Sequence, residues 1–180
     1  MPAQKSLKPL IALNIILFVI MSGFALFAFW PFSASPINSG APPTQIPAFG
    51  MASAMHEDGF NTASLKGDMM LLNIFASWCP PCEAEHPVLT ALSQDHNIPL
   101  YGIALTDKKD DLDDFLKRLG NPYSDIGMDY AGLMMGGLGV QGVPTTFLVD
   151  GDLNIIKTWQ GPVTPAIADN EILPHFQPPQ

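Results

Sequence analysis

Cysteine is almost absent from this 180-residue chain, which has only Cys79 and Cys82. A framework of several structural disulfides is therefore excluded. A bridge across two intervening residues closes so short a loop that it constrains the unfolded chain very little, and stabilisation is a poor explanation for the pair. A structural zinc site, the main alternative for a C-x-x-C motif, needs about four ligands. We predict no metal site, because the four histidines are scattered and unpaired: His56, His86, His96 and His175.

Basic residues are also scarce, with 8 Lys and Arg against 17 Asp and Glu. Two of the basic residues come before residue 9 and every acidic residue comes after residue 56. The chain beyond residue 30 therefore has six basic and seventeen acidic residues, a net charge of −11. Such a surface repels phosphate backbones, so we expect no nucleic-acid partner. The charge is explained by solubility, and a preference for basic protein partners is the alternative.

Charged residues are missing altogether between residues 9 and 56. Within this stretch, residues 10–30 are almost wholly apolar and long enough as a helix to cross a hydrocarbon core of about 30 Å. Because Lys5 and Lys8 precede this run, we expect a cytoplasmic N-terminus (1–9), a transmembrane anchor (10–30) and an exported remainder. A signal peptide cleaved near residues 33–35 is the alternative. Residues 31–45 have the composition of a linker, so the folded domain should span 46–180.

Beyond the linker, strand and helix patterns alternate. Apolar runs predict buried strands over residues 69–76 and 99–105. Helices are predicted over 83–94, with Pro87 inside, over 110–119 and more weakly over 165–173. Strands over 145–149 and 154–159 flank a hairpin turn at 150–152. The order predicts an α/β domain in which a central mixed sheet has helices on both faces.

The cysteine pair follows a predicted buried strand and begins a helix. Unpaired amide groups and the positive end of the helix dipole stabilise a thiolate at that position. A thiolate is the attacking species in disulfide exchange. We therefore expect Cys79 to be an exposed nucleophile and Cys82 the thiol that resolves the mixed disulfide.

These features resemble the thioredoxin superfamily. The resemblance lies in WCPPC after an apolar strand, in Pro87, and in Gly142-Val143-Pro144 before a hairpin strand. It implies a thioredoxin-like fold in which Pro144 is cis and packs beside the cysteines. It also implies that the backbone of Val143 pairs with an extended segment of the substrate.

The chain resembles more closely the DsbE/CcmG branch, membrane-anchored thiol:disulfide proteins of bacterial cytochrome c maturation. The similar stretches are residues 71–87, LKRLGNPY (116–123) and residues 138–164, and the similarity covers nearly all of 46–176. The family implies a single-pass protein of the bacterial inner membrane with its C-terminal domain in the periplasm. No cofactor is implied other than the redox-active disulfide.

The family also implies partners. It reduces the haem-binding cysteines of apocytochrome c, or mixed disulfides between them and another maturation protein, and is re-reduced by a membrane electron donor of the DsbD/CcdA type. Two alternatives stay open: a general periplasmic disulfide reductase or oxidase of the same fold, and a non-catalytic binding or metallochaperone module. The intact cysteine pair argues against the second.

Charged positions near the motif depart in part from the family. Glu85 retains an acidic residue and has two interpretations: it raises a cysteine pKa or assists proton transfer, or it is a solvated carboxylate. Thr145 stands where the family often has a glutamate after the cis-proline, and Glu83 where a basic residue is common. We interpret these departures as charge relocated around the site, with no acidic contribution from the side of Thr145.

Other residues invite interpretation as well. Trp78 is expected to shield the cysteines and contact substrate, or alternatively to pack under the site. His86 is more consistent with a structural role than with a catalytic one. The methionines, Met134 and Met135 included, are interpreted as core residues rather than as copper ligands. The acidic cluster over residues 107–114 is interpreted as a solvated helix start.

Two prolines lie between the cysteines, and they suggest the direction of electron flow. Pro80 and Pro81 have no N–H to donate to the Cys79 sulfur, so the thiolate is less stabilised than in a motif with free amides. A less stabilised thiolate favours the disulfide and makes the dithiol a better reductant. We predict that Pro80→His raises the reduction potential, measured by equilibration with glutathione. An unchanged or lower potential would contradict this role of the prolines.

Overall fold

The computed structural model describes residues 43–65 and 67–177 of the chain. A seven-stranded mixed sheet runs through this part in the order β2-β1-β5-β4-β3-β6-β7. Strands β3, β4 and β5 are parallel to one another, and the strands on either side join antiparallel. Their bounds are β1 (Gly50–Ser53), β2 (Phe60–Asn61), β3 (Met70–Phe75), β4 (Leu100–Leu105), β5 (Asp125–Asp129), β6 (Thr145–Val149) and β7 (Ile155–Gln160).

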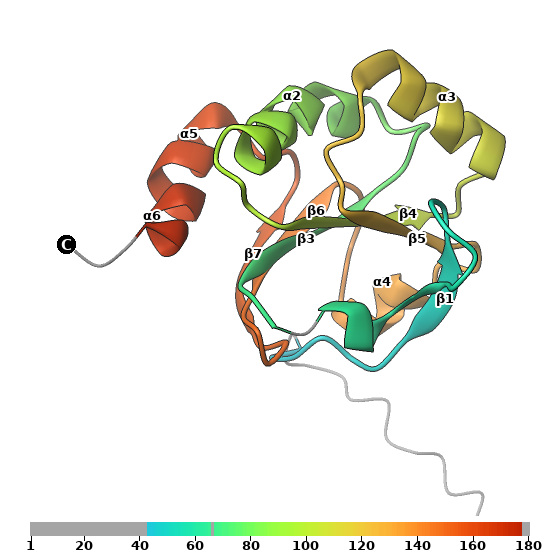
Figure 1. Ribbon diagram of the computed structural model, residues 1–180, viewed down its shortest axis with the longest axis horizontal. Helices are drawn as coiled ribbons and strands as arrows, with labels where there is room; N and C mark the ends of the chain where they lie inside the picture. The colour runs from blue at the N-terminus through green and yellow to red at the C-terminus, as the bar shows by residue number, and fades with distance from the viewer. Residues whose placement is uncertain (1–42, 66, 178–180) are drawn as a thin grey trace, which may run out of the picture. The chain divides into compact units, whose positions relative to one another are not determined.

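Helices cover both faces of the sheet, as predicted (Figure 1). On one side lie α2 (Pro80–Gln94), α3 (Lys109–Leu119) and a C-terminal segment. That segment joins α5 (Pro165–Ile167), the π-helical turn η2 (Ala168–Ile172) and α6 (Leu173–Phe176). The other side has α4 (Leu133–Leu138) and the short 3-10 helix η1 (Thr62–Leu65). Among residues 43–65 and 67–177, no helix has the length and apolar character needed to cross a membrane. The predicted anchor (10–30) and most of the linker lie outside the described residues.

The core has one layer on each side of the sheet. Successive side chains of a strand point to opposite faces, so Leu71 packs with the α2 and α3 layer while Leu72 packs with the α4 layer. All six residues of β3 are buried. This confirms the prediction that the strand before the cysteines is covered on both faces.

The strand and helix patterns located most of the central elements. Strand β6 has the predicted bounds, β4 and α3 differ from prediction by one residue at one end, and β3 and β7 by one residue at each end. Helix α2 begins three residues earlier than predicted, because prolines are well accommodated in the first turn of a helix. It continues through Pro87 to Gln94. Ile155 donates a backbone hydrogen bond to Thr44, so ordered contacts begin just before the predicted start of the domain.

Strands β1, β2 and β5 and helix α4 have no counterpart in the predicted elements. Strand β5 reads DIGMD, with an acidic residue at each end, and yet all five residues are buried. Its aspartates are hydrogen-bonded: Asp125 accepts from the Ser53 hydroxyl, and Asp129 accepts from the first amides of α4. Those partners belong to other segments, so the pattern of the strand alone does not reveal it.

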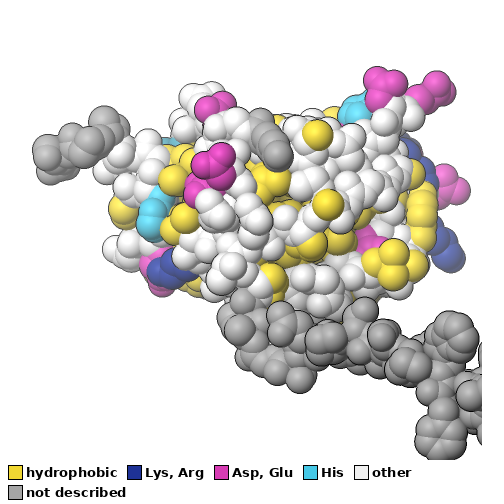
Figure 2. Space-filling model, turned by 90° about the horizontal axis from the view of Figure 1, so that it is seen from below, with side chains coloured by type: hydrophobic (Ala, Val, Ile, Leu, Met, Phe, Trp, Pro, Cys, Tyr) yellow, Lys and Arg dark blue, Asp and Glu magenta, His cyan; other side chains and the backbone are white. Residues whose placement is uncertain are grey.

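The face that carries α4 and β1 exposes apolar side chains (Figure 2). A groove of about 360 Å³ on this side is lined by residues that include Leu138 and Thr145. A second groove of about 500 Å³ lies between β1 and α4. Tyr130 and Leu133, which line it, are among the most exposed large apolar residues of the described chain.

Candidate active site

The two cysteines form a disulfide at the N-terminus of α2. Cys79 is the N-cap residue, and its Cα lies 5.3 Å from that of Cys82 in the first helical turn. The Cys82 amide donates to the Cys79 sulfur at 3.3 Å and to the Cys79 carbonyl oxygen at 3.1 Å. The strand-to-helix placement is as predicted, and one amide still reaches the sulfur because it comes after both prolines.

The loop that leads into the cysteines is fixed by a buried carboxylate at the end of the neighbouring strand. Asp107 accepts hydrogen bonds from the amide and the hydroxyl of Ser77, at 2.6 and 2.7 Å, and from the Lys108 amide. It is 4% exposed, so the interpretation of residues 107–114 as wholly solvated is wrong at Asp107. Strands β3 and β4 are parallel neighbours, and their carboxyl ends bring Ser77 and Asp107 together.

Both sulfur-bearing residues are buried, Cys79 at 4% and Cys82 at 2% exposure. The expectation of an exposed Cys79 is therefore wrong for the disulfide form. Cys79 packs into the apolar core layer on the α2 side of the sheet, and the Val143 carbonyl oxygen lies 3.7 Å from its sulfur. In the disulfide form, little of the Cys79 surface is open to a substrate sulfur.

Trp78 is 58% exposed, which rules out the alternative that it packs under the site. It lines a groove of about 300 Å³ immediately before the cysteines. The other lining residues come from the loop and from α3: Ser77, Asp111, Asp114, Phe115 and Arg118. Trp78 thus lies on the exposed surface beside the cysteines.

The loop before β6 lies against the cysteine pair. The Val143–Pro144 peptide bond is cis, which confirms the expectation drawn from the family resemblance. The Thr145 hydroxyl donates to the Gly142 carbonyl oxygen at 2.8 Å, and Thr145 is buried. Thr145, which stands where the family often has a glutamate, therefore holds the turn around Val143 through this hydrogen bond.

Glu85 lies one helical turn after Cys82 on the buried face of α2 and is 1% exposed. The interpretation of Glu85 as a solvated carboxylate is wrong. Its two oxygens accept hydrogen bonds from Asn73 Nδ2 at 3.0 Å and from the Val163 amide at 2.7 Å. Burial raises the pKa of Glu85 to about 7, against the lowering effect of these two donors. A group with such a pKa exchanges protons near neutral pH.

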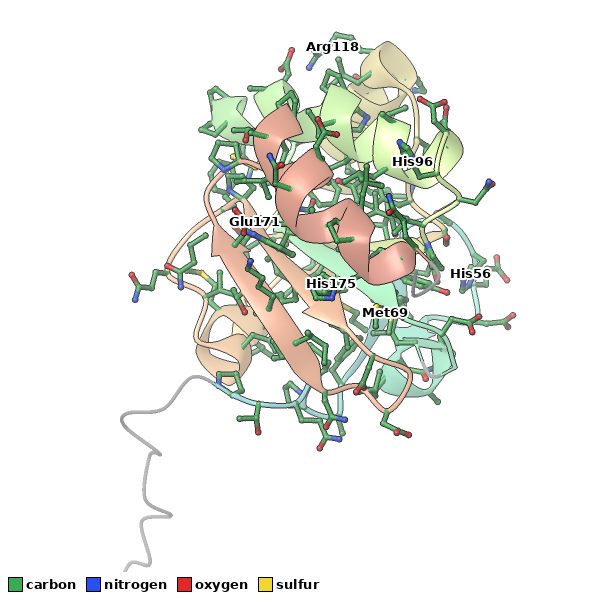
Figure 3. The ribbon with its side chains drawn as sticks, turned by 90° about the vertical axis from the view of Figure 1, so that its left-hand side faces the viewer. His56, Met69, His96, Arg118, Glu171 and His175 are labelled. Carbon is green, nitrogen blue, oxygen red and sulfur yellow. A yellow bond between two sulfur atoms is a disulfide. The ribbon has the colours of Figure 1, made fainter. Side chains whose placement is uncertain are left out.

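Two contacts fasten the start of α2 to the end of α3. Arg118, near the C-terminus of α3 (Figure 3), binds both oxygens of Glu83, and this hydrogen-bonded pair lowers the pKa of Glu83. His86 Nε2 donates to the Gly120 carbonyl oxygen at 3.0 Å, and burial lowers the pKa of His86. The charge of Glu83 is thus paired, and the geometry of His86 is that of a structural residue.

Some residues of the site had no signal in the sequence patterns. Asn73 is completely buried at the centre of β3, and Tyr123 is buried just before β5. Both belong to the hydrogen-bond network of Glu85. A buried asparagine within an apolar strand run is the signal that sequence reasoning passed over. Residues 43–65 and 67–177 contain no group of three or more His, Cys, Asp or Glu side chains arranged to hold a metal ion.

A mixed sheet between helices, a C-x-x-C disulfide at a helix N-terminus and a cis-proline loop beside it define a thioredoxin-like thiol:disulfide oxidoreductase. Comparison with known proteins agrees. Residues 41–172 match the Redoxin family. The chain is 34% identical to the thiol:disulfide interchange protein HelX of Rhodobacter capsulatus over 168 residues, 93% of this chain and 95% of the relative. It is 37% identical to DsbE of Escherichia coli over 134 residues, 73% and 72% of the two chains.

Solved structures share the fold. A thiol:disulfide interchange protein of the thioredoxin family from Chlorobium tepidum is similar with a TM-score of 0.63 and 27% identity, covering 77% of this chain and all of the other. A second protein of that organism, described as a DsbE, has a TM-score of 0.64 at 23% identity, with 77% and 96% coverage. The chain belongs to the Redoxin family, in its DsbE/CcmG group of thioredoxin-like thiol:disulfide interchange proteins.

The pKa of Glu85 predicts how stability depends on pH. Its pKa in the folded protein, about 7, exceeds the ordinary value of 4.5, so the folded state binds more protons between these pH values. The free energy of unfolding should therefore fall as pH rises from 4.5 to 7, by at most about 3 kcal/mol. Glu85→Gln should remove this fall, as measured by urea unfolding of the oxidised protein at several pH values.

Comparing the two proteins at each pH isolates Glu85 from the other titrating groups. The lowered pKa of His86 has the opposite effect, because stability from a neutral buried histidine increases with pH up to about 6.5, but it is present in both proteins. A difference between wild type and variant that stays constant from pH 4.5 to 8 would contradict the raised pKa of Glu85.

Proposed function

We propose that this protein is a membrane-anchored reductant of the bacterial periplasm. Its substrates are the haem-binding cysteines of apocytochrome c in disulfide form, or mixed disulfides between them and another maturation protein. A membrane electron donor of the DsbD/CcdA type restores its dithiol. The redox-active pair Cys79 and Cys82 needs no further cofactor. The family membership supports the exchange chemistry, and the direction and the substrate are the proposal.

The environment of the Cys79 sulfur is the observation that favours reduction over oxidation. Pro80 and Pro81 occupy the first two helical positions, where other residues would offer amides to the sulfur. The Cys82 amide remains, and it is shared with the Cys79 carbonyl oxygen. A thiolate with so few donors is weakly stabilised, so the disulfide is favoured and the dithiol gives up its electrons readily.

The reaction begins from the dithiol. The Cys79 thiolate attacks one sulfur of the substrate disulfide, and the bond between the substrate sulfurs breaks, which leaves a mixed disulfide with Cys79. Glu85 takes the proton of the Cys82 thiol, and the resulting thiolate attacks the Cys79 sulfur. The mixed disulfide then breaks, the substrate leaves with both sulfurs reduced, and the two thiol protons end on those sulfurs. Proximity drives the second step because both thiols are in one chain.

The surface around the pair supports recognition of an extended polypeptide. The Val143 backbone, adjacent to Cys79, is placed to pair with a strand of the substrate. Trp78 and its groove are placed to contact the residues that flank the target cysteine.

Trapping tests the function directly. In full-length Cys82→Ser, the mixed disulfide cannot be resolved, so a covalent complex with an apocytochrome c peptide that contains its oxidised cysteine pair should accumulate. Cys79→Ser is the matched control and should form none. Non-reducing electrophoresis and mass spectrometry measure the complex.

Three results would contradict this function. A reduction potential of the wild-type pair close to about −120 mV, the value of a strong oxidant, would replace reductase by oxidase. Exchange that is unaffected by either cysteine substitution would favour the binding-module alternative. A complex that forms equally with any oxidised peptide would support exchange without specificity and make the protein a general reductase.

Cell fractionation tests the membrane anchor. The uncharged run over residues 10–30 should keep the protein in the membrane after a carbonate wash, while external protease digests its domain in spheroplasts. Leu17→Arg places a charge in the centre of the run and should reduce membrane retention, whereas Ser33→Arg in the linker should not. Recovery of the wild-type domain as a shortened soluble periplasmic protein would support a cleaved signal peptide instead.

A further inference from the structure

A network of buried polar side chains lies beneath the cysteine pair. Asn73 is its centre, because its side chain contacts three other members. Asn73 Nδ2 donates to Glu85 Oε1 at 3.0 Å and to Thr146 Oγ1 at 2.9 Å, and Asn73 Oδ1 accepts from the Tyr123 hydroxyl at 2.9 Å. Each of the four residues is at most 5% exposed. The network therefore spans β3, β6, α2 and the segment before β5 and is almost completely shielded from solvent.

The contacts of Asn73 fix the orientation of its amide. The ionised Glu85 carboxylate only accepts hydrogen bonds, so when Glu85 is charged the amide nitrogen faces it and the amide oxygen faces Tyr123. Tyr123 is the donor that satisfies this oxygen. Without that hydroxyl, the oxygen would be a buried acceptor with no partner, which destabilises the observed orientation.

The Tyr123 ring packs in a space that the sheet leaves open at Gly102. It stacks on Phe75 with ring centroids 4.7 Å apart. A Cβ at Gly102 would lie 2.9 Å from the Phe75 ring and 3.0 Å from the Tyr123 ring, closer than side chains pack. The glycine in β4 therefore admits the tyrosine, and the ring brings its hydroxyl to Asn73.

We propose that Tyr123 is a positioning residue for the proton step at Cys82, acting through Asn73 to keep the Glu85 carboxylate in its accepting state. This inference rests on the proposed function, in which Glu85 takes the Cys82 proton. The chain of effect runs from the Tyr123 hydroxyl to the Asn73 amide and from the amide to the carboxylate.

The charged form of Glu85 is stabilised by neutral hydrogen-bond donors rather than by a nearby cation. From α2 it is flanked by Cys82 and by His86, whose ring is instead bound to the Gly120 carbonyl. The Thr146 hydroxyl of β6 accepts a hydrogen bond from Asn73 Nδ2, and the Val163 amide in the loop after β7 donates to Glu85 Oε2. No ion pair to Glu85 occurs among the residues that the structure describes. Without a nearby cation, the charged form of Glu85 depends on the Val163 and Asn73 donors.

Removal of the Tyr123 hydroxyl therefore has a defined direction. In Tyr123→Phe the Asn73 amide can rotate and present its oxygen to Glu85. An acceptor beside a carboxyl group favours the protonated acid, so the pKa of Glu85 should rise. The ring and its packing on Phe75 are retained, which limits the damage to the fold.

The experiment measures disulfide exchange by the full chain from pH 5.5 to 8.5, together with the NMR titration of the Glu85 side-chain carbon. For Tyr123→Phe, a shift of about half a pKa unit gives about threefold slower exchange at pH 6.5 and equal rates at pH 8.5. Tyr101→Phe is the matched control. It removes a hydroxyl with no hydrogen bond to the described residues from a ring stacked on Phe60, and it should shift nothing.

Glu85→Gln separates this inference from the proton step itself. If Tyr123→Phe slows exchange equally at every pH and leaves the Glu85 titration unmoved, the positioning role is wrong while the proton step stands. If Glu85→Gln leaves the rate and its pH profile unchanged, the proton step of the proposed function is wrong. If both are right, Tyr123→Phe in the Glu85→Gln background has no further effect on the pH profile.

A probe that preserves the fold covers the case in which Tyr123→Phe does not fold. Incorporation of 3-fluorotyrosine at the three tyrosines retains every hydroxyl and makes it a stronger donor. A stronger bond to the Asn73 oxygen polarises the amide, strengthens its bond to Glu85 and lowers the Glu85 pKa. If the acidic limb of the pH profile of exchange moves to lower pH, the inference is supported. If that limb stays in place, the inference is overturned.

Discussion

Burial of the Glu85 carboxyl group is the constraint on which the rest of the site depends. A carboxylate removed from water must be hydrogen-bonded, and the two donors that reach it come from β3 and from the loop after β7. Helix α2, which carries both cysteines, is thereby fixed to the centre of the sheet. The loop after β7 is fixed in turn to the cis-proline loop, because Gly161 donates to the Pro144 carbonyl oxygen. One side chain thus links the redox pair to the segment that is proposed to receive the substrate.

The chemistry of the site is divided between two neighbouring positions of α2. At the helix N-terminus, the prolines reduce the number of donors around the Cys79 sulfur and favour the disulfide. One turn later lies a buried carboxyl group with a pKa of about 7, the proposed acceptor of the Cys82 proton. The first feature bears on the direction of electron flow and the second on the rate at which the mixed disulfide is resolved.

The central elements of the fold were predictable because they depend on local patterns. The apolar run of β3, the amphipathic spacing of α3 and the turn before β7 each contain their own signal. Strand β5 was missed, because its terminal aspartates look like surface residues until Ser53 and the first amides of α4 are brought to them. The same limit applies to Asp107, which was interpreted as part of a solvated cluster and is the buried acceptor for the loop before the cysteines.

The sequence by itself determined the reaction class, since a C-x-x-C at a strand-to-helix junction is a local feature whose chemistry follows from the helix terminus. It also determined which residues flank the sulfurs and the absence of amides at Pro80 and Pro81. Only the tertiary structure decided that Cys79 is buried and that Glu85 is buried rather than solvated. It also decided that Asn73 and Tyr123 belong to the hydrogen-bond network of Glu85. Burial and pKa depend on residues as far apart in the chain as 73, 85, 123 and 163, and no local pattern records which of them meet.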